Sequence, residues 1–182
     1  MRSYTAQEVA EYVIERCIIK ENRIDNLKLQ KILFFVWMDY YKKTGRELFK
    51  EQFEAWECGP VVYSVYAKYK SFKDQQILPG SKTNLDEKDC TVLAPLIDKY
   101  ARLKGTDLVR KSHVKNGPWD QVYEYGEKHI LIDKESMKKY IDPIGYAEDE
   151  RDLETIRDIT SDPNYKSQCV DSDEFFKSLG IQ

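Results

Sequence analysis

The spacing of apolar and polar positions is most regular between residues 25 and 45, DNLKLQKILFFVWMDYYKKTG. Asp25 or Asn26 can cap the start of a helix, because a short side-chain oxygen accepts a backbone N–H of the first turn. Gly45 can end the helix, since glycine readily adopts the left-handed conformation. At about 100° per residue, apolar side chains cover most of the circumference. We therefore predict a buried core helix with one solvent-exposed edge, formed by Lys28, Lys31, Asp39, Lys42 and Lys43.

One aromatic side chain interrupts this polar edge. Phe35 falls among the lysines on the helical wheel, although the rest of the apolar surface lies elsewhere on the helix. Two interpretations remain open. Either a neighbouring segment of the chain covers Phe35, which we favour, or Phe35 is a contact for a partner protein.

Helical spacing returns on both sides of the central segment. Thr5 and Glu8 match the capping box, in which each side chain satisfies a backbone N–H at a helix start, and an apolar stripe follows from Ala6 to Ile18. Asp133 can cap a further helix over 134–141. Apolar stripes predict the other helices downstream of Gly59, over 60–72, 85–103 and 106–112.

Three prolines affect these helices. Pro60 suits the first position of the helix over 60–72, where its missing N–H costs nothing. Pro95 lies inside the stripe over 85–103, and a proline there removes a hydrogen bond at a cost of roughly 3 kcal/mol, so we expect a kink or a break. Asn116-Gly117 predicts a turn, followed by a helix start at Pro118-Trp119.

Two short stretches have the character of strands. Residues 52–58, QFEAWEC, alternate in a way that would place Phe53 and Ala55 on one face, with Glu54 and Trp56 on the other. Ile130-Leu131-Ile132 is the obvious partner for this segment. We therefore predict a mainly α protein, a compact helical domain with a small β element that pairs about 52–57 with 129–132, in which Trp56 is largely buried.

Composition indicates a folded, cytoplasmic protein. The 182 residues are 13% aromatic and 34% charged, which suits one domain with a sizeable core. The N-terminus, MRSYTAQEVAEY, has no apolar signal region. The longest apolar run of the central helix, 32–38, is too short to span a bilayer, so we expect no membrane partner.

Charge divides the chain into two parts. Residues 142–182 contain 11 Asp/Glu and 4 Lys/Arg, a net charge of −7, whereas residues 1–141 contain 21 acidic and 25 basic residues, a net charge of +4. We predict a domain over 1–141 and an acidic extension over 142–182, with a helix at 148–158 docked on the domain. Neither part has the strongly basic stripe of a nucleic-acid-binding protein.

The residues give little indication of catalysis. His113 and His129 are the only histidines, and neither they nor Cys17, Cys58, Cys90 and Cys169 have the spacing of a zinc site. Phosphate-binding and dinucleotide-binding glycine motifs do not occur. We expect no metal, no cofactor, reduced thiols and a structural role for His113; a hydrolase using His113 with a carboxylate is the lowest-ranked alternative.

Three motifs resemble those of a known family. Residues 26–35, NLKLQKILFF, are similar to the "NLKLQKLLYY" signature near the start of the Panacea domain of SocA-like antitoxins, also described as phage-associated proteins. Residues 54–62, EAWECGPVV, resemble its "EAWxxGPV" segment, and 108–113 with Pro118-Trp119 resemble its later "tH…PW" pattern. The resemblance covers about 1–141, and the motifs occur in the expected order.

The resemblance implies a bacterial or phage antitoxin and not an enzyme. Members of the family neutralise unrelated toxins by direct binding, and at least one branch resembles an adaptor that delivers its toxin to a Clp-type protease. No catalytic residue carries over. An accessory protein of a phage or mobile element that binds a host factor is the alternative. The positions that match the motifs form a scaffold: Leu29, Leu33, Trp56, Gly59, Pro60, Tyr66, His113 and Trp119.

Overall fold

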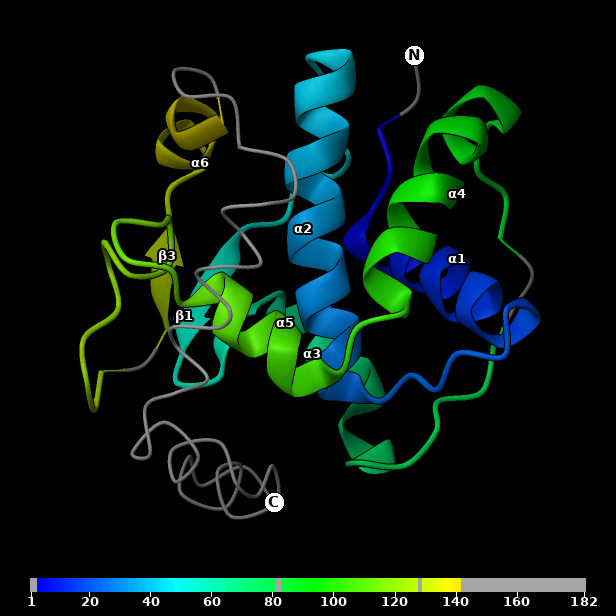
Figure 1. Ribbon diagram of the computed structural model, residues 1–182, viewed down its shortest axis with the longest axis horizontal. Coiled ribbons are helices and arrows are strands. Elements are labelled where there is room, and N and C mark those ends of the chain that lie inside the picture. Colours follow the sequence, from blue (N-terminus) through cyan, green and yellow to red (C-terminus); the bar gives the residue numbers. More distant parts are fainter. Residues whose placement is uncertain (1–2, 81–82, 128, 142–182) are drawn as a thin grey trace.

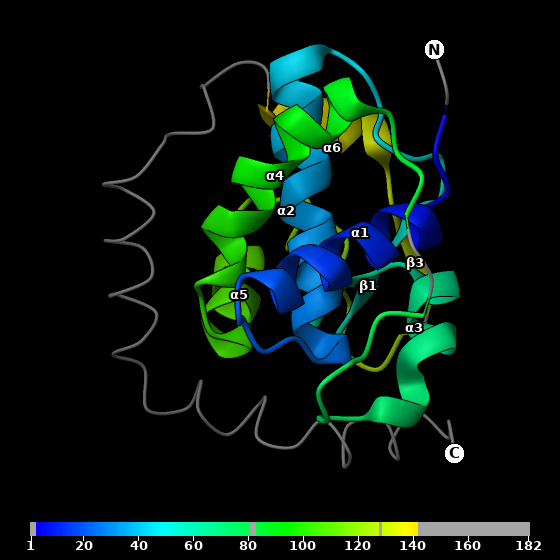
Figure 2. The same ribbon diagram turned by 90° about the vertical axis from the view of Figure 1, so that its right-hand side faces the viewer.

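Helix α2 (Asn26–Thr44) stands at the centre of the molecule (Figure 1). The computed structural model describes residues 3–80, 83–127 and 129–141. In Figure 1 α1 and α4 lie to the right of α2 and the sheet lies to its left; in the turned view of Figure 2, α1 crosses in front of α2. The remaining elements are α1 (Ala6–Ile19), β1 (Phe53–Trp56), β2 (Gly59–Val61), α3 (Tyr63–Tyr69), the 3₁₀ turn Lys70–Phe72, α4 (Glu87–Ala101), α5 (Gly105–Ser112), β3 (Ile130–Ile132) and α6 (Lys134–Ile141).

The predicted helix caps are confirmed. Glu8 N donates to Thr5 Oγ1 at 3.2 Å, and Thr5 N donates to Glu8 Oε2 at 2.8 Å, which completes the capping box of α1. Asp25 Oδ1 accepts from Lys28 N at 2.8 Å at the start of α2. Gly45 closes α2 with φ +66°. These caps fix the start of α1 and both ends of the central helix α2.

The prediction that α2 has a solvent-exposed polar edge is largely wrong. Helix α4 and the hairpin formed by β1 and β2 cover most of that edge. Lys28, Lys31 and Asp39 are buried, whereas Lys42 and Lys43 are exposed. Lys28 Nζ donates to Ala101 O at 2.7 Å, and Asp39 Oδ2 accepts from the Tyr100 hydroxyl at 2.7 Å. Burial of a charge is tolerated when hydrogen bonds replace its water, and a helical wheel cannot show which neighbours supply them.

The small sheet is antiparallel, with strand order β2-β1-β3. Strand β1 pairs with β3 in the register Phe53↔Ile132, Glu54↔Leu131 and Ala55↔Ile130, so the predicted pairing of about 52–57 with 129–132 is confirmed. The inward-facing Phe53 and Ala55 are fully buried. The protein is therefore mainly α with a small β element, as the sequence predicts.

The role predicted for Pro60 is wrong. The chain turns back at Gly59, and Pro60 lies in β2 opposite Ala55, while α3 begins only at Tyr63. A proline is acceptable there because β2 is an edge strand, whose N–H groups are not all required by the sheet. The sequence pattern predicts that the first strand ends at Gly59-Pro60. It does not predict that the chain turns back there and pairs with β1.

Two other expectations near prolines are affected. Helix α4 continues from Glu87 to Ala101 with Pro95 inside it, so the chain does not break there, and the alternative of a kink stays a prediction. Pro95 lies on the exposed side. No helix starts at Pro118-Trp119. Instead the described chain continues as turns towards β3, closed by hydrogen bonds such as Gln121 N to Gly117 O at 3.1 Å.

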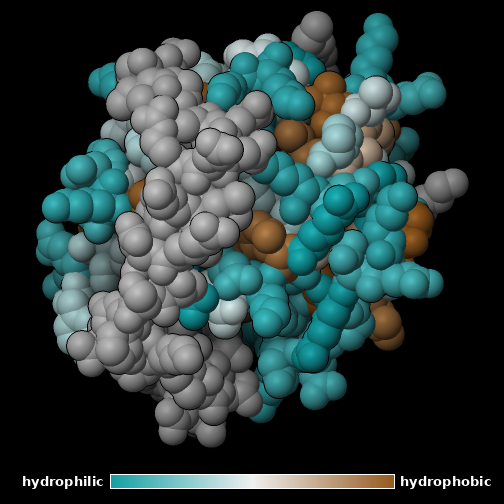
Figure 3. Space-filling view, in the orientation of Figure 1, coloured by the Kyte–Doolittle hydropathy of each residue, from teal (hydrophilic) through white to brown (hydrophobic). Residues whose placement is uncertain are grey.

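Where Figure 3 is coloured, the surface in the orientation of Figure 1 is mostly hydrophilic, with small hydrophobic patches. Among the described residues no helix has both the length and the apolar character needed to cross a membrane. The predicted helix over 148–158 and its docking lie outside the described residues.

Candidate functional site

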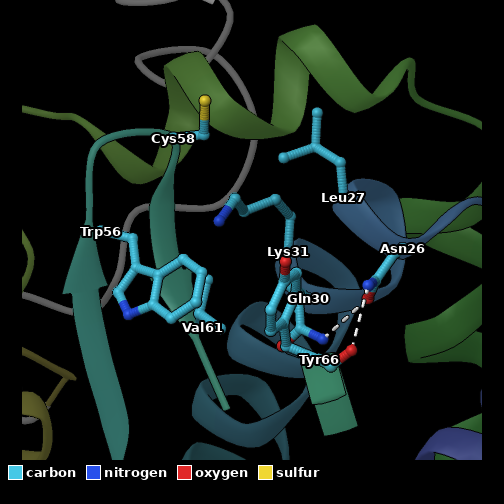
Figure 4. A pocket seen from close by; sticks show the side chains of 8 residues that line it. All are labelled: Asn26, Leu27, Gln30, Lys31, Trp56, Cys58, Val61 and Tyr66. Carbon is cyan, nitrogen blue, oxygen red and sulfur yellow. Dashed lines mark hydrogen bonds between the residues drawn. The ribbon is translucent and has the colours of Figure 1, made fainter. Parts of the chain in front are cut away.

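Polar side chains of α2 hold the β1–β2 hairpin and the start of α3. Lys31 Nζ donates to Pro60 O at 2.8 Å, and Gln30 Oε1 accepts from Val62 N at 2.9 Å. Asn26 Nδ2 donates to Tyr66 O at 3.3 Å and its Oδ1 accepts from Gln30 Nε2 at 3.2 Å (Figure 4). We call this region, Asn26, Gln30 and Lys31 with the backbone of 59–66, the α2–hairpin junction. Because these side chains bind backbone groups, they fix the path of the chain.

Gly59 lets α5 approach the junction closely. Its φ is +96°, a conformation that side chains other than glycine rarely adopt. A Cβ at this position would collide with Ser112 Oγ and lie 3.1 Å from Lys31 Cε and Nζ. The end of α5, the hairpin turn and the buried lysine therefore meet where only a hydrogen atom fits.

A stack of three rings continues from the end of α5. The His113 ring lies parallel to Trp119, with centroids 3.7 Å apart and an interplanar angle of 9°, and Trp119 stacks on Tyr123 at 4.4 Å. Trp119 Nε1 donates to Trp56 O at 2.7 Å, which joins this stack to β1. Burial of the ring, and then the nearby charge of Lys31, lower the pKa of His113 to about 3.

This environment fits a structural histidine. An effective general base has a pKa near the working pH, and His113 remains neutral with little basicity at pH 7. Its ring face is occupied by Trp119. The geometry therefore favours the structural role over the hydrolase alternative.

The junction borders a small recess with about 10 Å³ of space, room for about one water molecule. Ligand pockets are usually some 300–1,000 Å³, so this recess does not suit a substrate. Figure 4 shows the Lys31 side chain extending towards the hairpin beside it. The lining residues are Asn26, Leu27, Gln30, Lys31, Trp56, Cys58, Val61 and Tyr66.

The described residues offer no metal centre. No group of three or more His, Cys, Asp or Glu side chains in this part of the chain is arranged to hold an ion. Cys17, Cys58 and Cys90 are thiols, while Cys169 lies outside the described residues. Burial raises the pKa of Cys17 to about 11, so this thiol is protonated and unreactive at neutral pH.

Comparison with known proteins identifies the sequence family. The sequence model of the family described as "Antitoxin SocA-like, Panacea domain" matches residues 29–120. The chain belongs to this family. It is also 28% identical, over 134 residues, to "Antitoxin SocA" of Caulobacter vibrioides, covering 66% of this chain and 71% of that protein. No solved structure matches.

Membership of the Panacea family supports an antitoxin role, which is a regulatory role. The structure brings the predicted scaffold residues together in the interior. Leu29 and Leu33 are fully buried in the core. The others surround the junction and the ring stack: Trp56, Gly59, Pro60, Tyr66, His113 and Trp119.

The interpretation of Phe35 as a contact for a partner protein is wrong. Only 2% of this residue is exposed, so it cannot serve as a surface contact in this conformation. Its ring stacks on Tyr100 of α4 with centroids 5.1 Å apart, and Lys111 Nζ of α5 lies 5.7 Å from the ring centroid. The interpretation that a neighbouring segment covers Phe35 is the correct one.

Sequence reasoning missed the polar side chains that build the junction. Lys31 was assigned to the exposed edge, and no role was predicted for the side chain of Gln30. A usable signal was present, because Asn26 and Gln30 are four residues apart and therefore share a helix face. Two amides on one face of an otherwise apolar helix indicate buried backbone groups that need partners.

Proposed function

We propose that this Panacea-domain protein is an antitoxin that neutralises a cognate protein toxin by direct binding. The family match over residues 29–120 carries the proposal, and the similarity to Antitoxin SocA supports it. The arrangement of the motif residues is consistent with this role. Because they bind one another and the backbone in the interior, the motif maintains the fold and leaves the exposed side chains to recognise a partner.

The test uses the reading frame adjacent to the gene for this chain. Its product is expressed from an inducible promoter, alone and together with the full chain. We expect growth arrest without the chain, recovery with it, and co-purification of the two proteins at a fixed ratio. Unimpaired growth for every adjacent frame would contradict the proposal, and a single host protein recovered without a neighbouring product would favour the accessory-protein alternative.

Neutralisation has two forms that one further measurement separates. An antitoxin can occupy the active surface of its toxin, or it can present the toxin to a Clp-type protease. We propose the adaptor role as an addition to binding, on the basis of the family resemblance. The toxin half-life should fall when the chain is present and should recover in a strain without Clp protease; an unchanged half-life with restored growth would mean that binding alone is sufficient.

A further inference from the structure

Two exposed apolar side chains, Tyr63 and Leu131, lie at the sheet face that points away from α2, and a third, Tyr125, is close to this face in the chain. Among the large apolar residues described as exposed, Tyr63 is 47%, Tyr125 90% and Leu131 51% exposed. Leu131 lies opposite Glu54 in the β1–β3 pair, so both side chains are on the same face of the sheet. Exposed apolar groups on a fixed sheet face often mark a protein interaction site.

Hydrogen bonds and ring contacts hold this face in one arrangement. Glu54 Oε2 accepts from Trp56 Nε1 at 2.8 Å and lies 2.9 Å from His129 Nδ1. The His129 ring is 6.0 Å from the ring of Tyr63. His129 has φ +61°, an unusual conformation for a residue other than glycine, and such residues are found preferentially at functional sites. The ring of Tyr63 and the side chain of Glu54 are therefore held in place before any partner arrives.

Tyr125 belongs to the same region by chain connectivity. It precedes His129 by four residues, so the two Cα atoms are at most about 15 Å apart. Glu124 and Glu127, on either side of Tyr125, are exposed. We define the outer sheet face as Glu54, Glu57, Tyr63, Glu124, Tyr125, Glu127, His129 and Leu131.

The charge of this face is opposite to that of the domain. The segments 54–64 and 121–131 contain four Glu and one Lys, a net charge of −3, while residues 1–141 together carry +4. The negative charge is therefore concentrated in the two chain segments that carry the exposed apolar side chains. A partner segment that combines Lys or Arg with an aromatic or aliphatic residue would complement both features.

We propose that the outer sheet face is the toxin-binding surface and that it receives a basic segment of the toxin with an apolar anchor residue. This inference rests on the proposed antitoxin function. The tyrosines supply contact area at low entropic cost, and the glutamates attract and orient the basic residues. The buried junction beneath the face keeps β1 and β2 in place.

The test uses the full chain and the protein encoded by the adjacent reading frame. A photo-crosslinking amino acid replaces Tyr63 or Tyr125, and in separate variants Ile19 or Leu78, which are 66% and 63% exposed outside this face. Crosslinks to the neighbouring product are expected from positions 63 and 125 and not from 19 and 78. Tyr125→Ala should weaken binding about tenfold, whereas Ile19→Ala should change it less than about twofold.

A charge-reversal pair tests the chemistry of the partner. Glu124→Lys with Glu127→Lys should weaken binding about tenfold or more at low salt, and less at high salt. Asp74→Lys with Glu87→Lys changes the net charge equally at exposed positions elsewhere and should leave binding within about twofold. Unchanged melting temperatures exclude unfolding as the cause.

The outcomes separate the two proposals. If the wild-type chain neutralises the neighbouring product but crosslinks to it only from Ile19 or Leu78, the outer sheet face is wrong and the antitoxin function stands. Equal affinity of the Glu124→Lys/Glu127→Lys variant and the wild type would also overturn the surface. If the wild-type chain neither binds nor neutralises the product, the antitoxin proposal fails and the surface proposal fails with it.

Discussion

At Gly59 both the backbone conformation and the packing require a residue without a Cβ. Its positive φ is costly for any residue with a Cβ, and the space where the Cβ would lie is filled by Ser112 Oγ and Lys31. Lys31 is itself held by Pro60 O at 2.8 Å. A change at one of these residues therefore affects the turn, α5 and the central helix together.

Gly59→Ala separates the packing cost from the backbone cost when it is compared with Gly126→Ala. Gly126 has φ +85° but no atom within 4 Å of the added Cβ. Both variants pay about 1–2 kcal/mol for the backbone, and Gly59→Ala should lose about 1–3 kcal/mol more through overpacking. Urea unfolding measures both values, and equal losses would show that α5 does not press on the turn.

His113 gives a pH dependence whose sign can be worked out. Its pKa in the folded protein, about 3, lies below the ordinary value of 6.5, so below pH 6.5 the unfolded state binds a proton that the folded state does not. The free energy of unfolding should then fall by up to about 1.4 kcal/mol per pH unit as the pH decreases towards 3. The slope contributed by this residue should disappear in His113→Asn.

NMR titration measures the protonation of His113 directly. The His113 ring signal should stay at its neutral position between pH 8 and pH 5, with the two histidine signals assigned by His113→Asn and His129→Asn. A midpoint near 6.5 for His113 would contradict the burial of its ring. Loss of stability in His113→Asn with toxin binding intact would further support a structural role.

At the scale of elements, most boundaries could be predicted and most partners could not. Local chemistry determines the caps at Thr5, Asp25 and Gly45, so their sequence signals are reliable. Strand β2 was missed because three residues around Pro60 have no strand periodicity; they become a strand only through pairing with β1. Burial of Lys28 and Asp39 depends on α4, which begins more than forty residues later in the chain.

In the candidate site, too, the sequence indicates single positions but not the contacts between them. Motif resemblance identifies Trp56, Gly59 and His113 as important positions, but their mutual contacts follow from the tertiary fold. The outer sheet face has an even weaker sequence signal. Tyr63 and Leu131 are 68 positions apart in the chain, and only the β1–β3 pairing and the ring contact of Tyr63 with His129 bring them to one face.

Trp56 is the side chain that anchors the sheet to the helices. It is 6% exposed, packs edge-on against Tyr66 with centroids 4.9 Å apart, and its carbonyl accepts from Trp119 Nε1. Trp56→Ala should lower the free energy of unfolding by about 3–5 kcal/mol. Leu131→Ala in the same sheet should lower it by no more than about 0.5 kcal/mol. Denaturant unfolding of both variants checks this contrast, which similar losses would contradict.

The molecule as a whole has an uneven charge distribution. Residues 1–141 together carry +4, and residues 142–182, which lie outside the described residues, carry −7. Removing the extension would change the net charge of the chain from −3 to +4. Because the core described above consists of residues between Tyr4 and Ile141, we expect the domain to fold without the extension.

Truncation after Pro143 tests the contribution of the extension. The shortened chain should unfold cooperatively but neutralise the toxin less well, because a basic toxin loses long-range attraction to the −7 segment. A full-length variant with seven of the eleven acidic residues of 142–182 changed to Asn or Gln has an extension of zero net charge. It controls for chain length and should behave like the truncation. Affinity is measured at low and high salt, since screening removes exposed electrostatic attraction. If the truncated and full-length proteins bind the toxin equally tightly at both salt concentrations, the extension has no role in recognition, and the outer sheet face must supply the electrostatic attraction without it.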